Sequence, residues 1–404
     1  MDFVFSKRAK MIAIILMVVG LVGSIVGALM GGGHDHGHSH MADRVWSNLL
    51  INGFFFFGIS LAGLFFLALQ YAAEVAWSVM VKRVFEAIIS FLPIGGAVII
   101  LVLAAGQFHM HHIYHWMDPN VYDITSPDYD EIIANKYAYL NPVFFWARTL
   151  IFIGVWYYFA RWFRKKSLEQ DLVGGTAIHY KSVTKAAIFL VIFGFSSSVM
   201  SWDWLMSIDT HWFSTMYGWF VFSGMWVSAM ITCTLIIIYL KSKGLLPSFN
   251  QSHLHDMGKW VFAVSMLWTY LWFCQFMLIW YANIPEEVTY YVERIKHYPL
   301  LFFGITFINF FFPFFILMSR DAKRNIIFLL PVALIIFMGH WLDVYLLVTP
   351  GVMHDAGAHI GLLEISMFLG FLGLFVFTVF TQLAKAPLEV KNHPFLEESV
   401  HHHI

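Results

Sequence analysis

The chain has 404 residues, of which 59% are hydrophobic, 19% aromatic and only 12% charged, and its mean hydropathy is +0.70. Soluble globular domains carry about 25% charged residues, so this composition excludes that class and indicates an integral membrane protein. The formal net charge of −1 gives no reason to expect a nucleic-acid partner.

Ten apolar runs follow one another along the chain, each near the roughly 20 residues that an α-helix needs to cross a hydrocarbon core about 30 Å thick. The first run follows Lys7, Arg8 and Lys10, but it is too long for the apolar core of an ordinary signal peptide, so we predict a mature helix. The sequence therefore predicts an all-α polytopic membrane protein with spans at residues 11–30, 49–71, 85–106, 143–163, 185–205, 217–240, 258–281, 298–318, 326–348 and 362–383.

The Lys and Arg residues are unevenly divided between the two sides of these spans. Nineteen of the 24 fall on the side that also holds both termini. Because cytoplasmic loops carry the excess of Lys and Arg, we expect both termini to be cytoplasmic. Of the other five, Arg148 lies well inside an expected span.

Histidines and acidic residues gather in the loops of the opposite side, and one of these loops, between the third and fourth spans, is long enough to contact a partner. A glycine-preceded tract holds His34, His36, His38 and His40, but it has no fixed geometry, so we expect no functional metal site there. The chain lacks a Cys-x-x-Cys-His motif, and its two cysteines are too few for an iron–sulfur cluster. We predict no metal centre and no covalently bound cofactor.

Ionisable side chains near the bilayer centre cost roughly 2.5 to 3.5 kcal/mol or more, so each is a candidate functional residue. Arg148 lies early in the fourth span and Asp203 at the outer end of the fifth, at a similar depth. We expect them to neutralise each other and to offer hydrogen bonds to a polar ligand head group, with His112 at the same level. A buried ion pair that only fixes packing, within an interfacial belt of aromatic residues, is the alternative.

A second polar group is expected in the later spans. His340 and Asp343 are three residues apart and share one helical face of the ninth span, and Glu364 begins the tenth. A membrane histidine that only forms a hydrogen bond between helices is the alternative for His340.

Acidic residues on the cytoplasmic side suggest a proton pathway. Glu74 and Glu86 would take up protons there, although Glu86 could also only snorkel beside neighbouring basic residues. The groups that would release protons on the other side are Asp203, His340, Asp343 and Glu364.

A weak internal repeat predicts how the spans are grouped. NGFFFFG (Asn52–Gly58) is similar to YGWFVFSG (Tyr217–Gly224), and NPVFFWA (Asn141–Ala147) to YPLLFFG (Tyr298–Gly304). Two similar offsets favour two parallel four-helix bundles with one peripheral helix before and one after them. The expected parts are an N-terminal helix with a histidine-rich outer loop, two four-helix bundles, and a last helix with a cytoplasmic tail, at residues 1–48, 49–216, 217–361 and 362–404.

Three longer segments carry a family resemblance: SWDWLMSIDTHWFSTMYG (Ser201–Gly218), HDMGKWVFAVSMLWTYLWFCQFMLIWYANIPEE (His255–Glu287) and AWSVMVKRVFEAIISFLP (Ala76–Pro93). The motif WYANIPEE after the seventh span is the most specific feature. With the ten spans, these segments resemble the polysulfide-reductase membrane-subunit (NrfD/PsrC) superfamily, and within it the ActF family of bacterial alternative complex III.

The resemblance implies a subunit of a quinol:cytochrome c or quinol:oxidase electron-transfer complex in the bacterial inner membrane. The implied partners are a homologous quinol-binding membrane subunit, periplasmic iron–sulfur and multihaem cytochrome c subunits, a cytochrome oxidase and membrane lipids. The resemblance further implies either a site for menaquinone or ubiquinone near His112, Arg148 and Asp203 or a proton pathway, without a redox centre in this chain.

Two other functional classes stay open. A structural scaffold would use the same aromatic loops and helix faces to hold partners, and it would tolerate polar substitutions. A secondary transporter would need broken helices and a midplane substrate site, whereas the apparent repeat is parallel and the polar groups lie toward the outer rim.

Overall fold

The computed structural model describes residues 2–31, 38–354 and 359–403, and these residues form helices and connecting turns without any strand. Ten helical segments are long and apolar enough to cross a membrane. The expectation of an all-α polytopic protein is therefore confirmed. Of the histidine tract, His34 and His36 lie outside the described residues.

Eight of the ten spans are formed by one long helix each, although the fifth ends in the short 3-10 turn η5 (Met206–Ile208). They are α1 (Lys7–Gly31), α2 (His38–Ala72), α6 (Pro142–Val173), α7 (Ala177–Trp204), α8 (Tyr217–Ser242), α9 (Gln251–Ala282), α14 (Ile326–Met353) and α15 (Leu362–Leu383).

The other two spans change their helical form part-way. The third runs through α3 (Lys82–Ile88), the 3-10 turn η2 (Ile89–Phe91) and α4 (Leu92–Gln107), and the eighth through α11 (Pro299–Thr306), the π-helix η6 (Phe307–Phe311) and α12 (Phe312–Leu317). A proline follows each irregular segment, Pro93 and Pro313. Proline has no N–H to donate to the carbonyl four residues earlier, which accounts for both irregularities.

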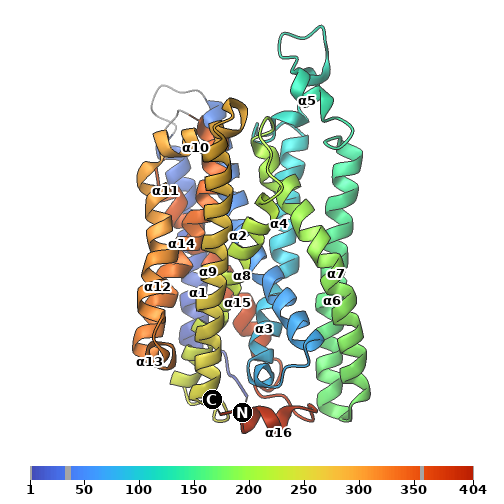
Figure 1. The fold of residues 1–404 in the computed structure, drawn as a ribbon, viewed down its shortest axis with the longest axis vertical. Coiled ribbons are helices and arrows are strands. Elements are labelled where there is room, and N and C mark those ends of the chain that lie inside the picture. The colour runs from blue at the N-terminus through green and yellow to red at the C-terminus, as the bar shows by residue number, and fades with distance from the viewer. Residues whose placement is uncertain (1, 32–37, 355–358, 404) are drawn as a thin grey trace.

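Shorter helices lie outside these long helices. They are η1 (Trp77–Met80), η3 (His115–Met117), η4 (Pro119–Tyr122), α5 (Glu131–Asn135), η5 (Met206–Ile208), α10 (Pro285–His297), α13 (Arg320–Arg324) and α16 (Leu396–Val400). Both chain ends lie at one end of the molecule, beside α16, and α5 and α10 lie at the other (Figure 1). We call these the terminal end and the distal end.

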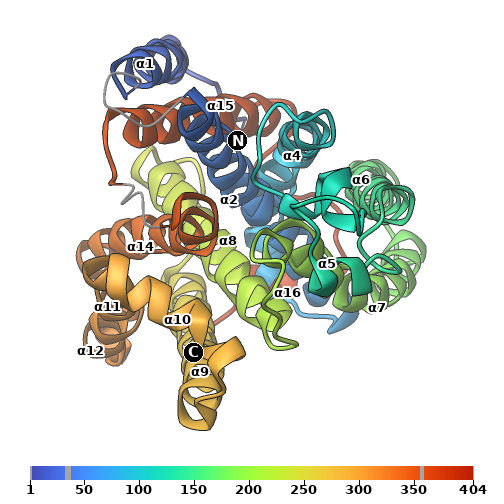
Figure 2. The same cartoon turned by 90° about the horizontal axis from the view of Figure 1, so that it is seen from above.

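Helices α2 and α8 form the centre of the molecule. Viewed along the helices, α4, α6 and α7 lie on one side, and α9, α11, α12 and α14 lie on the other (Figure 2). Helix α2 contacts α4, α7, α8, α14 and α15, and α8 contacts α2, α7, α9 and α14. Because α2 and α8 pack closely on each other, the division into two bundles at residue 216 stays a prediction.

Helix α1 is held at the margin of the molecule by close contact with α15. A Cβ placed on Gly20 would lie 2.2 Å from the Cα of Gly370, and one on Gly27 would lie 2.8 Å from the backbone nitrogen of Leu363. Only glycine allows this approach. Inside lipid the hydrophobic effect does not drive helices together. Small residues promote helix association there because they permit dense van der Waals packing.

The C-terminal tail after α15 crosses the terminal end. Its Lys391 N–H donates to Asp171 Oδ1 at 2.9 Å, and further on His402 Nε2 lies 2.6 Å from Asp256 Oδ2. Asp171 belongs to α6 and Asp256 to α9, so the tail ties together helices from the two sides of the centre.

Candidate functional site

The ion pair expected between Arg148 and Asp203 is present at the distal end. Arg148 Nε donates to Asp203 Oδ2 at 2.7 Å, and its Nη2 donates to Oδ1 at 3.0 Å. The remaining guanidinium donors reach the carbonyl of Tyr139, and the guanidinium carbon lies 4.0 Å from the ring centroid of the same residue. Both charged residues are buried, so the pair is closed on itself.

Local sequence explains this arrangement. Asn141 caps α6 by accepting from the N–H of Phe144 at 3.0 Å, and Pro142 supplies the first helical residue. Arg148 therefore follows the start of α6 by less than two turns, and Asp203 is the penultimate residue of α7. Since α6 and α7 are antiparallel neighbours, the two side chains meet at the same depth.

His112 does not join this pair. Its side chain is exposed, and its backbone N–H donates to Asp43 Oδ1 at 2.7 Å; no contact with Arg148 or Asp203 is found among the described residues. The buried neighbour is His111, whose Nε2 lies 2.9 Å from the carbonyl oxygen of Val102 and whose pKa is lowered by burial. The sequence did not distinguish these adjacent histidines.

An open groove lies at the distal end beside the loop that contains η3 and η4. It has a volume of about 570 Å³, and its lining includes Gln107, Trp116 and Tyr122. The indole nitrogen of Trp116 and the amide oxygen of Gln107 are buried, and neither has a hydrogen-bond partner in the part of the chain that the structure describes. Trp116 also packs against Phe145 of α6, with ring centroids 5.0 Å apart, so the groove adjoins the helix that carries Arg148.

The second aspartate of the SWDWLMSIDTHW segment forms an ion pair that the sequence did not predict. Arg294 of α10 is almost fully buried, and its Nη2 donates to Asp209 Oδ2 at 3.2 Å. The guanidinium also donates to the carbonyls of Tyr290 and Leu346 and lies over the Tyr290 ring. Burial raises the pKa of Asp209, and the charge of Arg294 opposes that shift.

Asp203 and Asp209 thus have separate partners on opposite sides of the centre. One contacts α6 and the other contacts α10. The sequence contains a signal for helix α10 that could have located Arg294. Residues 285–297 have amphipathic spacing, with acidic residues in the first turn and basic residues in the last turn.

His340 lies in the interior between α2, α8 and α14. Both of its ring nitrogens are buried and have no hydrogen-bond partner among the described residues, and Nδ1 lies 3.9 Å from Asp343 Oδ2. Asp343 in turn accepts a hydrogen bond from Trp268 Nε1 at 3.0 Å. A cavity of about 10 Å³, roughly the space of one water, is lined by both His340 and Asp343.

A second cavity continues from Asp343 toward the distal end. It has a volume of about 20 Å³, and its lining includes Asp343, Gln275, Tyr291 and Arg294. Asp343 lines both cavities, and Arg294 connects the second one to Asp209, whose side chain is 17% exposed. A discontinuous row of polar groups therefore leads from His340 to the distal surface.

The π-helix lies beside this row. Asn309 is the central residue of η6, and its Oδ1 and Nδ2 are buried with no hydrogen-bond partner in residues 2–31, 38–354 and 359–403. A Cβ on Gly339 would lie 2.1 Å from Asn309 Oδ1, so glycine at this position admits the amide. Because Gly339 precedes His340, the irregular span places a polar side chain close to the buried histidine.

Glu364 is not associated with His340. It pairs with Arg44 of α2 through Nε at 2.8 Å and Nη2 at 3.0 Å, and it accepts from Asn48 and from the N–H of Gly361. These bonds hold the start of α15 against α2. Arg44, which the sequence placed in an outer loop, is therefore the partner that fixes α15 on α2.

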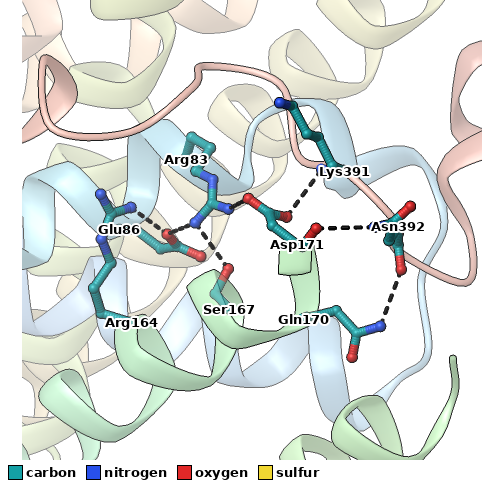
Figure 3. Close-up of polar contacts among 8 residues, drawn as sticks. All are labelled: Arg83, Glu86, Arg164, Ser167, Gln170, Asp171, Lys391 and Asn392. Atoms are coloured by element: carbon teal, nitrogen blue, oxygen red, sulfur yellow. Dashed lines mark hydrogen bonds and ion pairs between the residues drawn. The ribbon is translucent and has the colours of Figure 1, made fainter. Parts of the chain in front are cut away.

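At the terminal end, Glu86 is enclosed by basic residues (Figure 3). Its Oε2 accepts from Arg83 at 2.7 Å and from Arg164 at 2.5 Å, and Arg83 also pairs with Asp171. Glu86 therefore does not snorkel to the surface. Glu74, by contrast, is half-exposed, and its Oε1 lies 3.7 Å from Nε2 of His179.

The six residues predicted for a proton pathway are thus divided among separate places. His340 and Asp343 share a cavity, whereas Asp203, Glu364 and Glu86 are each held by an arginine, and Glu74 lies at the surface. In the described part of the chain, no three His, Cys, Asp or Glu side chains are grouped as metal ligands.

Comparison with models of protein families and with curated proteins finds no match to this chain.

Proposed function

We propose that the chain is a membrane subunit of a bacterial respiratory quinol:cytochrome c or quinol:oxidase complex, of the ActF type, and that it contributes a proton route. The row His340, Asp343, Arg294 and Asp209 with its two cavities carries this proposal. The resemblance of the three sequence segments supports the respiratory context, and the excess of Lys and Arg at the terminal end supports a cytoplasmic location for that end.

The chemistry of the row suits proton release toward the distal side. An imidazole with two unpartnered nitrogens can accept a proton at one nitrogen and donate one from the other. One water in the first cavity would connect His340 with Asp343, and a water in the second would connect Asp343 with the Arg294–Asp209 pair. The row does not require this chain to contain a redox centre, because electrons would pass through partner subunits.

Proton translocation by the native complex in membrane vesicles tests this role. We expect His340→Leu and Asp343→Asn to keep quinol oxidation but to lower the number of protons released per electron. His111→Gln is the matched control, since His111 is buried and does not line either cavity. An unchanged stoichiometry in both variants would leave a scaffold role for the chain.

Purification of the complex tests the context separately. Affinity isolation of this chain from its native membranes is expected to bring with it a homologous membrane subunit and subunits with iron–sulfur and haem c spectra. Absence of haem c from a complex that is otherwise intact would contradict the respiratory assignment.

The distal groove supports a second candidate function, a quinone site. Trp116 and Gln107 line the groove, and a small side-chain movement would bring the buried indole N–H to a quinone carbonyl and the buried amide oxygen to a quinol hydroxyl. Because Arg148 and Asp203 already satisfy each other, the groove is a better place for the head group than the pair itself. Trp116→Phe is expected to weaken binding of a quinol-site inhibitor; equal affinity in the wild-type protein and the variant would exclude the groove.

A further inference from the structure

A large groove opens on the side of the molecule near the terminal end, away from the proton row. Its volume is about 850 Å³, and it lies between α6 and the segment formed by α3, η2 and the start of α4. The lining combines an apolar floor with the basic residues Arg161, Arg164 and Lys165.

The basic residues lie on consecutive turns of α6. Arg161 and Lys165 are four residues apart, so they share one face of the helix, and both side chains are exposed. No carboxylate pairs with either of them in the described part of the chain. Arg161 Nη1 instead donates to the hydroxyl of Tyr157, one turn closer to the membrane centre, at 3.1 Å.

The acidic residue in the groove is already neutralised. Glu86 accepts hydrogen bonds from both Arg83 and Arg164, so it contributes little free negative charge (Figure 3). Arg164 uses Nη1 for this contact. The groove therefore has an excess of positive charge, which Arg161 and Lys165 carry at its surface.

The deeper part of the groove suits hydrocarbon. Ile89, Pro93 and Ala160 line it, and a Cβ placed on Gly154 of α6 would meet no atom within 4 Å. The open space at Gly154 lies about two turns from Arg161, so a ligand with a charged head and an apolar chain would extend along α6. Tyr157 and Tyr158 lie between these parts, as aromatic residues do at a membrane interface.

We propose that this groove binds an anionic phospholipid of the leaflet at the terminal end, with its phosphate at Arg161, Arg164 and Lys165 and an acyl chain beside Gly154. Basic pockets between transmembrane helices bind phosphate head groups in this way, because charge attraction adds to hydrocarbon burial. The site is independent of the proposed proton route, which lies on the other side of the α2 and α8 centre.

Lipid titration of the purified protein in detergent tests the site, with phosphatidylglycerol and phosphatidylcholine compared by native mass spectrometry. We expect phosphatidylglycerol to bind preferentially and the double variant Arg161→Gln/Lys165→Gln to bind it at least tenfold more weakly. Neither side chain has a partner in an ion pair, so the variant should fold. Lys181→Gln/Lys185→Gln on α7 removes the same charge at the same end and is expected to retain binding.

The outcomes distinguish a lipid phosphate from free phosphate, and attraction by the groove from attraction by general surface charge. Competition by inorganic phosphate at an affinity equal to that of the lipid would identify a free-anion site and overturn the lipid assignment. Equal losses in the two double variants would show that general surface charge, and not the groove, attracts the lipid. A Gly154→Leu variant should lower lipid affinity without changing charge; an unchanged affinity would contradict the place assigned to the acyl chain.

Discussion

Arg148 and Asp203 form a buried bidentate pair in which the two hydrogen bonds are 2.7 and 3.0 Å long and the remaining guanidinium donors reach the carbonyl of Tyr139. A ligand head group at this place would have to break these bonds. The pair therefore links α6 and α7 at their distal ends.

Replacing one member of the Arg148–Asp203 pair should lower the stability of the fold more than replacing both. Asp203→Asn or Arg148→Met leaves a buried charge without its partner, which costs about 3 to 5 kcal/mol, whereas Arg148→Met/Asp203→Leu removes both charges and should recover much of this loss. Thermal unfolding in detergent measures the three variants. Additive losses in the double variant would contradict an interaction between them.

Proton stoichiometry of Asp203→Asn separates the structural role from a role in the proton pathway. We expect the number of protons released per electron to stay unchanged in complexes that remain assembled, because the row that we propose runs through His340 and Asp343. A lowered stoichiometry with normal assembly would return Asp203 to the pathway.

Arg294 is expected to hold α10 on the end of α14. It is buried and donates to the carbonyls of Leu346 and Leu347 as well as to Asp209. Arg294→Gln should lower the free energy of unfolding by about 3 kcal/mol or more, because Asp209 and both carbonyls lose a donor. Lys296→Gln on the same helix is the control for charge alone, and an equal effect of both changes would exclude the contact as the cause.

Packing of α1 should depend on its small residues. Gly20→Leu places a side chain where even a Cβ would lie 2.2 Å from Gly370, so we expect α1 to separate from α15. Cross-linking between cysteines introduced into the two helices measures the separation. Leu21→Ala, on the exposed face of α1, is the control and should leave the cross-link unchanged.

The docking of the C-terminal tail should weaken in acid. Burial, with a smaller effect of the nearby Lys82, lowers the pKa of His393 from its ordinary 6.5 to about 2. The released tail therefore binds a proton before the docked tail does. Docking is fully favourable above about pH 6.5 and weakens as the pH falls below that value, by a factor of about ten at pH 5.5.

Hydrogen exchange of residues 386–400 at pH 7.5 and 5.5, corrected for the intrinsic pH dependence, measures this change. His179 and Lys82 face His393 in the docked state, so their substitution is a less specific test. His393→Gln should abolish most of the extra exchange at pH 5.5. The same acid response in this variant would assign the effect to another group, such as the His402–Asp256 contact.

The ten spans were predictable, but their lengths were less so. The apolar runs gave approximate limits because about 20 residues cross a hydrocarbon core. Helix α6 continues beyond its predicted limit to Val173, and helix α7 begins before its predicted limit, at Ala177. Polar residues such as Lys, Arg, Glu and Gln are good helix formers, so a helix can continue beyond its apolar run. The irregular turns before Pro93 and Pro313 were signalled by the prolines, whereas their 3-10 and π forms depend on the surrounding packing.

The candidate site was predictable in part. Arg148 and Asp203 were expected at one depth, and they meet there. His112 was expected at the same level, but its side chain is exposed and the adjacent His111 is buried instead, because the local backbone turn decides which of the two side chains points inward. Arg294 was assigned to a loop, so its burial and its bond to Asp209 were missed.

The sequence alone determined the membrane class, the number of spans and the common side of the two termini, because these depend on composition and on the order of apolar and basic residues along the chain. The tertiary structure decided which charges pair, that Asp343 lines two cavities and that Glu364 binds Arg44. Such contacts join residues as far apart as 320 positions, and they depend on how the helices are rotated and packed, which no local pattern specifies.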